Sequence, residues 1–327
     1  MTIGLTYDLR SDYLKEGYSE EETAEFDRES TIEAIERALQ QLGYLTDRIG
    51  HVRHLIDRLS RGDRWDMVFN ICEGMFGIGR EAQVPAILDA YRIPYTFSDA
   101  LVLSLTLHKG MTKRVVRDCG IPTPDFAIVE NEADILQVNL PYPLFVKPYA
   151  EGTGKGIDSN SKVNDSEELE STCKSLLPRF SQGLIVETYL PGREFTVAIA
   201  GTGQESRSLG VMEVVLKTSA EANAYSYINK EFCEEHVIYK LVKDDMSNRC
   251  EEVALAAWRC LNCRDAGRID IRLDQLGNPS FIEVNPLAGL HPEHSDLPII
   301  CNFQGIPFAE VIRMIMDSAK KRLDNQP

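Results

Sequence analysis

The sequence lacks any apolar run near the roughly 18–20 residues that a membrane-spanning helix needs. Its first residues show no basic segment followed by an apolar stretch, so no secretory signal is predicted. The eight cysteines have no regular spacing, which predicts reduced thiols in the cytoplasm rather than a disulfide framework. Cys260-x-x-Cys263 has no second pair, so we expect a structural role for it and not a zinc site.

Positive charge is also scarce, with 35 Lys and Arg against 51 Asp and Glu and a net charge of −16. This balance argues against nucleic-acid and membrane partners, because phosphate groups need a basic footprint. Neither an internal repeat nor a low-complexity linker is present. With 327 residues, of which 43% are hydrophobic and 26% charged, the chain can form two or three subdomains with a sizeable core.

What the sequence does contain is a regular succession of strands and helices. Over the first hundred residues they alternate, which predicts a parallel α/β layer. The predicted strands there are 2–7, 44–49 and 66–71, and the predicted helices are 25–42, 51–60 and 81–91. A helix at 106–119 leads into a β-rich stretch with the segments PLFVKP, GLIVETYL, EFTVAIAG and LGVMEVVLK. A helix over 248–263, a hairpin and a closing helix over 307–322 complete the chain.

The hairpin GRIDIRLDQLGNPSFIEVNPLAGL carries the most informative polar residues. Folding about Leu276–Gly277 would place Asp270 opposite Glu283 and Arg268 opposite Asn285. Directly opposed residues have Cβ atoms about 4.5–5.5 Å apart, where two carboxylates repel each other. A divalent cation would offset that repulsion, because Asp, Glu and Asn oxygens are its preferred ligands. A solvated polar face on an edge hairpin is the alternative.

The same alternation predicts which side chains of the second hairpin strand are buried. Because successive side chains point to opposite faces of a strand, Ile282 and Val284 are expected in the core. Phe281, Glu283 and Asn285 are then expected together on the other face.

A strand that carries Lys147 leads into a glycine-rich loop, in the segment FVKPYAEGTGKGI. Gly152, Gly154 and Gly156 would let backbone N–H groups approach phosphate oxygens, and the lysine adds positive charge. The spacing is not that of a Walker loop, and no clear helix follows. A flexible hairpin turn is the alternative explanation.

A third segment, LIVETYLPGREFTVAIAG, has an apolar strand that ends at Glu187 and a turn before Glu194. A glutamate that opens a strand in this way could accept ribose hydroxyls. A solvated strand end is the alternative, and the segment alone does not decide between them.

The order of these segments resembles the ATP-grasp superfamily, and most closely the D-alanine–D-alanine ligases. Lys109 in a helix is followed by VKPYAEGTGKG, VETYLPGREFTV, YINK, GRID and FIEVNP, from about Asp66 onward. The resemblance implies an α/β (α+β) ATP-grasp fold with an N-terminal Rossmann-like parallel α/β domain. The expected division is an N-terminal domain at 1–98, a central ATP-grasp subdomain with the glycine-rich loop at 99–186, and a C-terminal ATP-grasp subdomain with the Mg²⁺ and substrate site at 187–327.

The resemblance also implies a nucleotide site for ATP. Lys109 and Lys147 would contact the phosphates, and the glycine loop would close over them. Glu187 to Leu190 would line the adenine edge through backbone groups, and Glu194 would hold the ribose. The expected nucleotide residues are Lys109, Lys147, Glu151, Gly152, Thr153, Gly154, Glu187, Tyr189, Leu190 and Glu194.

Metal and catalytic roles follow from the same resemblance. Asp270, Glu283 and Asn285 would ligate Mg²⁺, with a pair of ions expected and Mn²⁺ as a substitute. Arg268 would neutralise charge on the transferring phosphoryl group, and Lys230 would contact phosphate from a loop. In the implied reaction a carboxylate attacks the γ-phosphate of ATP, and an amine then attacks the resulting acyl phosphate to give an amide, ADP and phosphate.

The chain departs from the D-alanine ligases around the amino-acid pocket. The glycine-rich first loop of that family is replaced by TYDLRSDY, and its His-Gly-Arg-Gly-Gly-Glu-Asp-Gly loop by CEGMFGIGRE. Thr153-Gly154 stands where the family has two serines, with Lys155 added. NPLAG stands where the family has Asn-Thr-Ser-Pro-Gly, and Glu231 stands where it has a tyrosine. The candidate substrate residues are Ser295, Gly289, Glu231, Glu73 and Arg80, with a surface salt bridge as the alternative for Glu231, Glu73 and Arg80.

These features together predict an enzyme, a carboxylate–amine ligase that uses ATP and forms a peptide or amide bond between small molecules. One alternative is a ligase of the same kind for a different amino acid or amine pair, in dipeptide synthesis or specialised metabolism. Another is a nucleotide-binding relative without catalysis, which the retained Arg268, Asp270, Glu283 and Asn285 disfavour. The sequence leaves the acyl donor and the amine open, and the resemblance is compatible with a homodimer through the first α/β layer.

Overall fold

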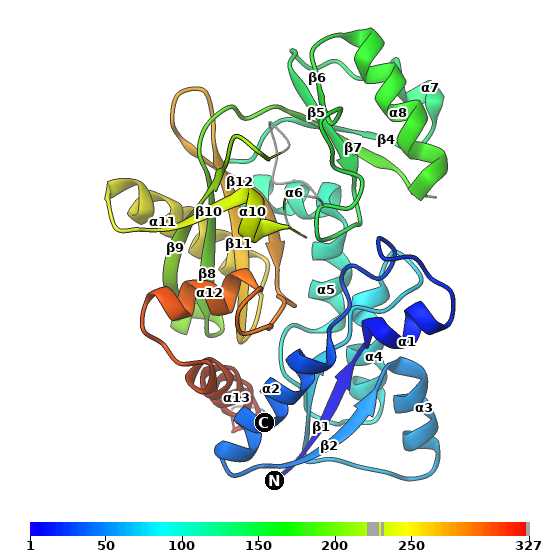
Figure 1. Ribbon diagram of the computed structural model, residues 1–327, viewed down its shortest axis with the longest axis vertical. Helices are drawn as coiled ribbons and strands as arrows, with labels where there is room; N and C mark the ends of the chain where they lie inside the picture. The colour runs from blue at the N-terminus through cyan, green and yellow to red at the C-terminus, as the bar shows by residue number, and fades with distance from the viewer. Residues whose placement is uncertain (181, 221–228, 230–231, 325–327) are drawn as a thin grey trace.

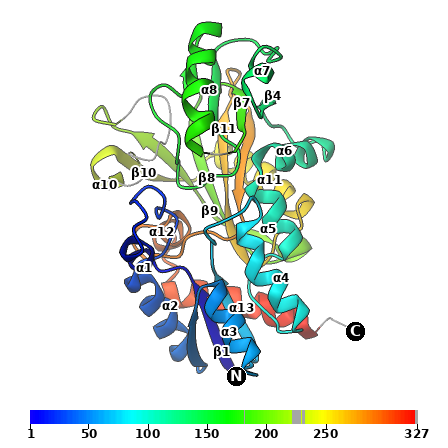
Figure 2. The same ribbon diagram turned by 90° about the vertical axis from the view of Figure 1, so that its right-hand side faces the viewer.

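The computed structural model describes residues 1–180, 182–220, 229 and 232–324, and its strands form three sheets. Figures 1 and 2 both show the parallel sheet at one end of the molecule, a five-stranded sheet in the middle and a four-stranded sheet at the far end. The architecture is therefore α/β, with the parallel N-terminal layer that the sequence predicted and two antiparallel layers.

The first sheet has the order β2-β1-β3 and is parallel. Its strands are β1 (Thr2–Tyr7), β2 (Leu45–Gly50) and β3 (Met67–Ile71). The helices around it are α1 (Arg10–Lys15), α2 (Glu29–Gln41), α3 (Val52–Ser60), the short 3₁₀ helix η1 (Arg80–Ala82) and α4 (Gln83–Ala90). Helix α2 begins at Glu29 rather than at residue 25, so the preceding residues are available for other contacts.

The four-stranded sheet has the order β4-β7-β5-β6 and is antiparallel. It consists of β4 (Phe126–Val129), β5 (Leu144–Pro148), β6 (Lys162–Val163) and β7 (Leu184–Thr188), with the helices α7 (Glu132–Ile135) and α8 (Ser166–Phe180). The sequence interpretation missed β4 and α8. Helices α5 (Ala100–Leu107) and α6 (Lys109–Asp118) precede this sheet, and the predicted single helix at 106–119 breaks at His108.

The five-stranded sheet has the order β10-β9-β8-β11-β12 and is antiparallel. Its strands are β8 (Glu194–Ala200), β9 (Arg207–Leu216), β10 (Val237–Val242), β11 (Ala266–Leu273) and β12 (Pro279–Asn285). The remaining helical elements are η2 (Gly203–Glu205), α10 (Cys233–His236), α11 (Asp245–Cys260), α12 (Asp296–Phe303) and α13 (Phe308–Asp324). The division of the chain at residues 98 and 186 stays a prediction, and its second boundary falls inside β7.

A shared hydrophobic core joins the first sheet to the five-stranded sheet. Ile3 on β1, Ile35 on α2 and Ile312 on α13 belong to the same buried cluster as Ala198 on β8 and Ile300 on α12. Helix α11 packs against the opposite face of β8, since Val197 and Trp258 lie in a second cluster. The shared core therefore holds the first sheet and the five-stranded sheet together.

The predicted register of the hairpin is confirmed. Asp270 pairs with Glu283 and Arg268 with Asn285. The register then shifts beyond Asp270, because Ile271 pairs with Phe281 and leaves residue 282 as an extra residue on β12. Such a bulge reverses the faces of the residues that follow it.

The bulge overturns one prediction about β12. Phe281 is fully buried in the core, whereas Ile282 is half-buried and lines a pocket. The simple alternation had placed each of these side chains on the opposite face. Val284 is buried, as predicted.

The expectation that all cysteines are reduced is wrong for one pair. Cys119 at the end of α6 and Cys260 at the end of α11 form a disulfide across 141 residues of sequence. Folding alone brings these two cysteines together, so no local spacing could have indicated the bond. Cys260 is thereby occupied, and Cys263 is a buried free thiol, which agrees with a structural role for Cys260-x-x-Cys263.

No single helix of the described residues is long and apolar enough to cross a membrane. Helices α12 and α13 pass that test only as a pair, and their axes are bent by 114° at the break between them.

Candidate active site

Asp270 and Glu283 face each other across β11 and β12, and neighbouring cations offset their repulsion. Thr196 donates a hydrogen bond to Asp270 Oδ1 at 2.9 Å, and Arg268 Nη1 lies 2.5 Å from Asp270 Oδ2. Lys109 Nζ lies 3.5 Å from Glu283 Oε2. A metal ion is therefore not the sole group that can balance these acids, and the inference from repulsion alone is weaker than the sequence suggested.

The hairpin nevertheless has the donor set that Mg²⁺ prefers. Asp270 and Glu283 offer carboxylate oxygens, and Asn285 offers an amide. The amide nitrogen of Asn285 is buried, has no hydrogen-bond partner among the described residues and can donate to a ligand oxygen, whereas Oδ1 is the atom of this amide that a metal ion would use. The described residues contain no group of three or more His, Cys, Asp and Glu that could hold a metal ion. The set thus fits an ion that phosphate oxygens and water also coordinate.

A pocket of about 80 Å³ opens beside the hairpin, between β12 and the strands β5 and β7. It brings together most of the residues expected at the nucleotide, namely Lys109, Lys147, Glu151, Gly154, Glu187, Tyr189, Leu190 and Glu194. Gly152 and Thr153 line the adjoining cavity instead. Asp270 and Glu283 also line the small pocket, so its polar end meets the predicted metal ligands.

The carboxylate of Glu187 is buried between two buried lysines. Lys113 Nζ lies 2.8 Å from Glu187 Oε1, and Lys147 Nζ lies 3.1 Å from Oε2. Burial acts to raise the pKa of Glu187, but the two lysines hold it below its usual value. Burial lowers the pKa of Lys113 to about 8 although Glu187 opposes it. The Glu187 side chain therefore positions Lys147, a contact that the prediction of a backbone role did not include.

Lys113 was missed by the sequence interpretation. It follows Lys109 by four residues on α6, so the two lysines lie on one face of the helix. That spacing was the available signal.

The end of the small pocket near Tyr189 also carries an ion pair. Arg272 Nη1 lies 3.4 Å from Glu194 Oε2, and Arg272 Nη2 donates to the Tyr189 hydroxyl at 3.2 Å. The Arg272 guanidinium lies over the Tyr189 ring at 5.1 Å from its centroid. Glu194 is thus held in place at the pocket, where a ribose contact stays a prediction.

The glycine loop joins the first sheet region through a network of three ion pairs, of which the pair between Lys155 and Glu25 bridges the two parts. Glu25, just before α2, pairs with Arg80 at 2.9 Å and with Lys155 at 2.8 Å, and Lys155 also pairs with Glu151 at 2.5 Å. Arg80 Nη1 donates to the Ala150 carbonyl at 2.8 Å. Although burial opposes it, Arg80 and Lys155 lower the pKa of Glu25 to about 2. Arg80, a candidate for substrate recognition, is instead engaged in this contact.

The glycines of the loop have a steric reason. A Cβ atom on Gly152 would lie 2.2 Å from Glu25 Oε1, so a larger residue would displace this carboxylate from its ion pairs with Arg80 and Lys155. Lys109 Nζ donates to the carbonyl of Glu151, and Gln182 donates to Glu151 Oε1 at 2.6 Å. The loop therefore rests on charged groups from α6 as well as on the first sheet region.

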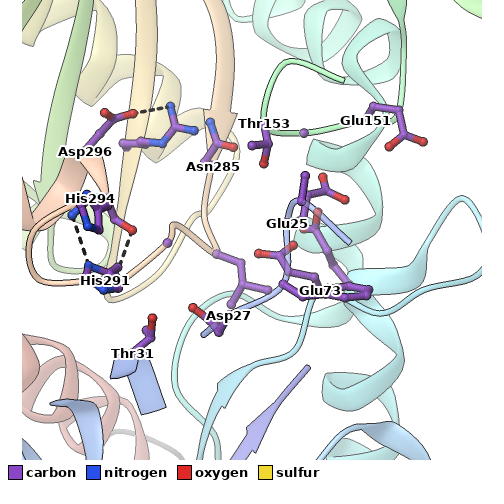
Figure 3. Close-up of a pocket in the computed structure, with 18 of the residues that line it drawn as sticks. Glu25, Asp27, Thr31, Glu73, Glu151, Thr153, Asn285, His291, His294 and Asp296 are labelled. Carbon is purple, nitrogen blue, oxygen red and sulfur yellow. Dashed lines mark hydrogen bonds and ion pairs between the residues drawn. The ribbon is translucent and has the colours of Figure 1, made fainter. Parts of the chain in front are cut away.

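A larger cavity of about 450 Å³ adjoins the hairpin and reaches the first sheet region. Figure 3 shows His291, His294 and Asp296 on one side of it and Asp27 and Glu73 on the other. The predicted substrate residues Ser295, Gly289 and Glu73 all line this cavity, together with Arg268 and Asn285. Lys230 and Glu231 lie outside the described residues.

Two of these residues are closely packed. The backbone N–H of His291 donates to Ser295 Oγ at 2.9 Å, which leaves the Ser295 hydroxyl proton able to donate to a ligand. A Cβ on Gly289 would lie 2.8 Å from Ser295 Oγ, so the glycine permits this arrangement. Arg268 lies between Asp270 and Asp296, which raise its pKa against the effect of burial and keep it charged.

Asp27, Glu73 and Glu81 form a group of carboxyls in this cavity that we term the acid wall. Burial, then the charge of Asp8, raises the pKa of Asp27 to about 7. Burial raises the pKa of Glu81 to about 7 although Arg80 opposes it. The pKa of Glu73 lies well above its usual value because of burial and then Glu81.

The acid wall forms no salt bridge within the described part of the chain. Sequence reasoning pointed to Glu73 but missed Asp27 and Glu81. Asp27 sits in the acid-rich stretch SEEETAEFDRE, which is typical of a solvated surface, and Glu81 was assigned to a helix without a role. No sequence signal separates these acids from the others around them.

Comparisons with known proteins agree on one family. Residues 115–317 match the family described as D-ala D-ala ligase C-terminus. A D-alanine–D-alanine ligase of Aquifex aeolicus is 30% identical over 288 residues, which are 88% of this chain and 93% of the relative.

Two solved structures share the fold. A D-alanine–D-alanine ligase from Bacillus anthracis complexed with ATP superposes with a TM-score of 0.74 at 21% identity and covers 100% of both chains. The VanG D-Ala:D-Ser ligase from Enterococcus faecalis gives a TM-score of 0.74 at 19% identity and covers 97% of this chain and 99% of its own. Together with the matched family and the 30% identical relative, they establish that this chain belongs to the D-alanine–D-alanine ligase family of ATP-grasp ligases.

Proposed function

We propose that this enzyme joins a carboxylate to an amine through an acyl phosphate, with ATP in the small pocket and Mg²⁺ at the hairpin. The observation that carries the proposal is the register of β11 and β12. It sets Asp270 opposite Glu283 at the mouth of a pocket that also contains Lys109 and Lys147. Carboxylates and lysines arranged around one pocket suit a magnesium–nucleotide complex.

The hairpin residues have two proposed roles near the reacting phosphate, metal binding and neutralisation of charge. Asp270, Glu283 and Asn285 would hold Mg²⁺, which supplies charge neutralisation for phosphoryl transfer when bound. Arg268 lines the larger cavity on the same strand as Asp270, so its guanidinium can reach charge that develops on the substrate carboxylate. A fixed cation at that point stabilises the transition state more than the free substrate.

The lysines position the triphosphate. Lys147 is held by Glu187, and Lys109 is held by the carbonyl of Glu151 and by Glu283. Both ammonium groups are nearly buried, so they present charge without a large loss of freedom on binding. We propose the same phosphate-contacting role for Lys230. The glycine loop, from Glu151 onward, would exclude water that could hydrolyse the acyl phosphate.

The nucleotide base and sugar would occupy the other end of the small pocket. Tyr189 and Leu190 follow β7 there, and Ile282 projects from the bulge of β12. We assign the ribose hydroxyls to Glu194. The bulge thus has a function in this proposal, since it turns an apolar side chain from the core toward the base.

The two substrates would meet in the larger cavity. Ser295 is a donor for a substrate carboxylate, and Gly289 gives it room. Relatives are named for D-alanine and for D-Ala:D-Ser, so the family accepts more than one amino-acid pair. We propose amino acids or amine-bearing acceptors as substrates, in dipeptide synthesis or specialised metabolism, and leave D-alanine as one member of the panel to be tested.

The wider setting is also a proposal. We infer a cytoplasmic enzyme, because ATP must be supplied, although the Cys119–Cys260 disulfide removes the argument from reduced thiols. We infer small molecules as its partners and a homodimer through the first α/β layer.

An ADP-release assay tests the proposed function. The purified full-length chain with ATP and Mg²⁺ would be offered a panel of amino acids, carboxylates and amines, singly and in pairs, and amide products would be identified by mass. We expect ADP release that depends on a pair of substrates. ATP binding without ADP release from any pair would instead support a nucleotide-binding protein without catalysis.

A further inference from the structure

The acid wall is the part of the larger cavity that the proposed ligase reaction does not use. We propose that Asp27, Glu73 and Glu81 bind an alkylammonium group of the substrate, so that the enzyme acts on diamino acids or diamines. This inference rests on the proposed function for its reaction, but the binding it describes can be measured without turnover.

The first argument is a balance of charge. Glu25 lies beside the wall, but Arg80 and Lys155 already neutralise it. Asp27, Glu73 and Glu81 form no salt bridge within the described residues. A substrate with a single α-ammonium group brings one positive charge to these three carboxyls. Arg10, Arg28, Lys109 and Arg268 also line the cavity, and burial raises the pKa of each wall carboxyl, so a second ammonium group would bind by drawing these carboxyls into their charged form.

The second argument is the state of Glu81. Its residue is 9% exposed, its side chain lines the cavity, and no described residue hydrogen-bonds or ion-pairs with it. A carboxylate so far removed from bulk water needs a partner to stay charged. The cavity is where such a partner can bind, because no described residue ion-pairs with Glu81, and Arg80 and Lys109 act on it only through their charge.

The third argument is where the wall lies in the sequence. Glu73 and Glu81 both belong to CEGMFGIGRE, the segment that replaces a loop of the D-alanine ligases. The fold fixes this segment tightly, since Gly74 has a φ of +72° and a Cβ on it would lie 2.7 Å from the carbonyl oxygen of Arg80. The acids are therefore placed by a rigid turn, at the point where this chain differs from its family.

The chemistry of the wall favours an organic cation over a metal ion. No group of three or more Asp, Glu, His and Cys among the described residues has the arrangement for a metal ion. An ammonium group has three donors and tolerates carboxylates that are farther apart. The cavity of about 450 Å³ falls in the range that holds small organic ligands, typically 300–1,000 Å³.

The test compares substrates that differ in one terminal group. Lysine against norleucine, ornithine against norvaline and putrescine against butylamine would be assayed for ADP release, with both enantiomers of each amino acid. We expect kcat/KM to favour the cationic member of a pair by about tenfold or more, the effect of one charge-assisted hydrogen bond. The putrescine arm separates a diamine acceptor from a diamino acid.

Variants assign the preference to the wall. Glu81→Gln and Glu73→Gln should each raise KM for the cationic substrate by about tenfold and leave KM for ATP unchanged. Glu33→Gln is the matched control, since Glu33 is an exposed acid on α2 that pairs with Arg37 and should change neither value. Equal kcat/KM within the pairs, or a preference that survives Glu81→Gln, would overturn the proposal.

Calorimetry keeps this result separate from the proposed reaction. Lysine and norleucine would be titrated into the full chain with ADP and Mg²⁺. If no pair of substrates gives ADP release, the proposed function fails, yet tighter binding of lysine that Glu81→Gln abolishes would still support the wall. Equal binding of the two amino acids would refute the wall whatever the outcome for turnover.

Discussion

The small nucleotide pocket and the acid wall treat buried charge in opposite ways. In the pocket, Glu187 is matched by Lys113 and Lys147 at hydrogen-bonding distance. In the wall, burial and then the charge of Glu81 raise the pKa of Glu73, and burial and the charge of Glu25 raise the pKa of Glu81. Both regions lie against the same hairpin and loop, so their difference does not come from their depth in the molecule.

The difference shows which part of the site is complete before a ligand binds. The pocket carries its own counter-charges, as the proposed nucleotide site requires. The wall carboxyls form no ion pair within the described residues, and burial favours their protonated forms until a cation binds. The conserved chemistry of the family would then lie in the pocket and the selectivity of this chain in the wall.

The largest expected effect is on turnover, when the proposed metal ligands beside the small pocket are substituted. Asp270→Asn or Glu283→Gln should lower the rate of ADP release by at least about 10²–10³-fold, because a preorganised charge at the phosphate is lost. The fold should persist, since each change removes one of two opposed acids. Asp317→Asn on α13, an exposed acid, is the control. Near-normal turnover in either hairpin variant would contradict the metal assignment.

A second large effect should appear in stability on the same side. Glu187→Gln leaves two buried lysines without their shared partner and should destabilise the fold by about 3–5 kcal/mol in urea unfolding. Glu132→Gln, which breaks an exposed pair with Lys174 at 3.8 Å, should change stability by no more than about 1 kcal/mol. Similar losses in the two variants would show that the pocket is not specially organised.

Removing an acid from the wall should raise the stability of the fold, whereas removing Glu187 from the pocket should lower it. Because the pKa of Glu81 rises from 4.5 to about 7 on folding, the stability that its proton confers is full below pH 4.5 and is lost as the pH rises through 7. Glu81→Gln lacks this loss and should be more stable than the parent by about 1–2 kcal/mol at pH 8. Urea unfolding of both proteins from pH 4.5 to pH 8 measures this gain in the free energy of unfolding. If the difference in stability between variant and parent does not change with pH, the pKa of Glu81 is not raised in the folded protein.

The smallest expected effect concerns the contact that links the two regions. Lys155→Met removes one of the cations on Glu25 and should free the glycine loop. We expect hydrogen exchange in residues 151–156 and ATP hydrolysis without substrate to rise by about fivefold, equivalent to roughly 1 kcal/mol. Lys174→Met on α8 is the control. If loop exchange stays unchanged, the ion pairs with Glu25 do not hold the loop.

The pairing of the proposed metal ligands across the hairpin was the most predictable feature of the site. Strand alternation and the turn at Leu276–Gly277 were enough to pair Asp270 with Glu283, and the structure has that register. The prediction failed at Phe281 and Ile282, because a bulge adds a residue that alternation cannot count. Local patterns thus place side chains correctly up to the first irregularity in a strand.

Contacts between distant segments were not predictable in the same way. Lys113 on α6 had a local signal, its spacing from Lys109. Its partner Glu187 lies on β7, far along the chain, and no local pattern indicates that contact. The disulfide between Cys119 and Cys260 joins residues 141 positions apart and contradicted the composition argument. Composition describes averages, so it does not say which two cysteines meet.

The sequence by itself determined the α/β succession, the polar face of the hairpin and the order of segments that marks the ligase family, because each depends on neighbours along the chain. The tertiary structure alone decided that Glu25 fastens the glycine loop and that Asp27, Glu73 and Glu81 share one cavity. Those acids are ordinary in the sequence. Burial and mutual proximity, which arise only when the sheets assemble, raise their pKa values and make them the proposed site for an ammonium group.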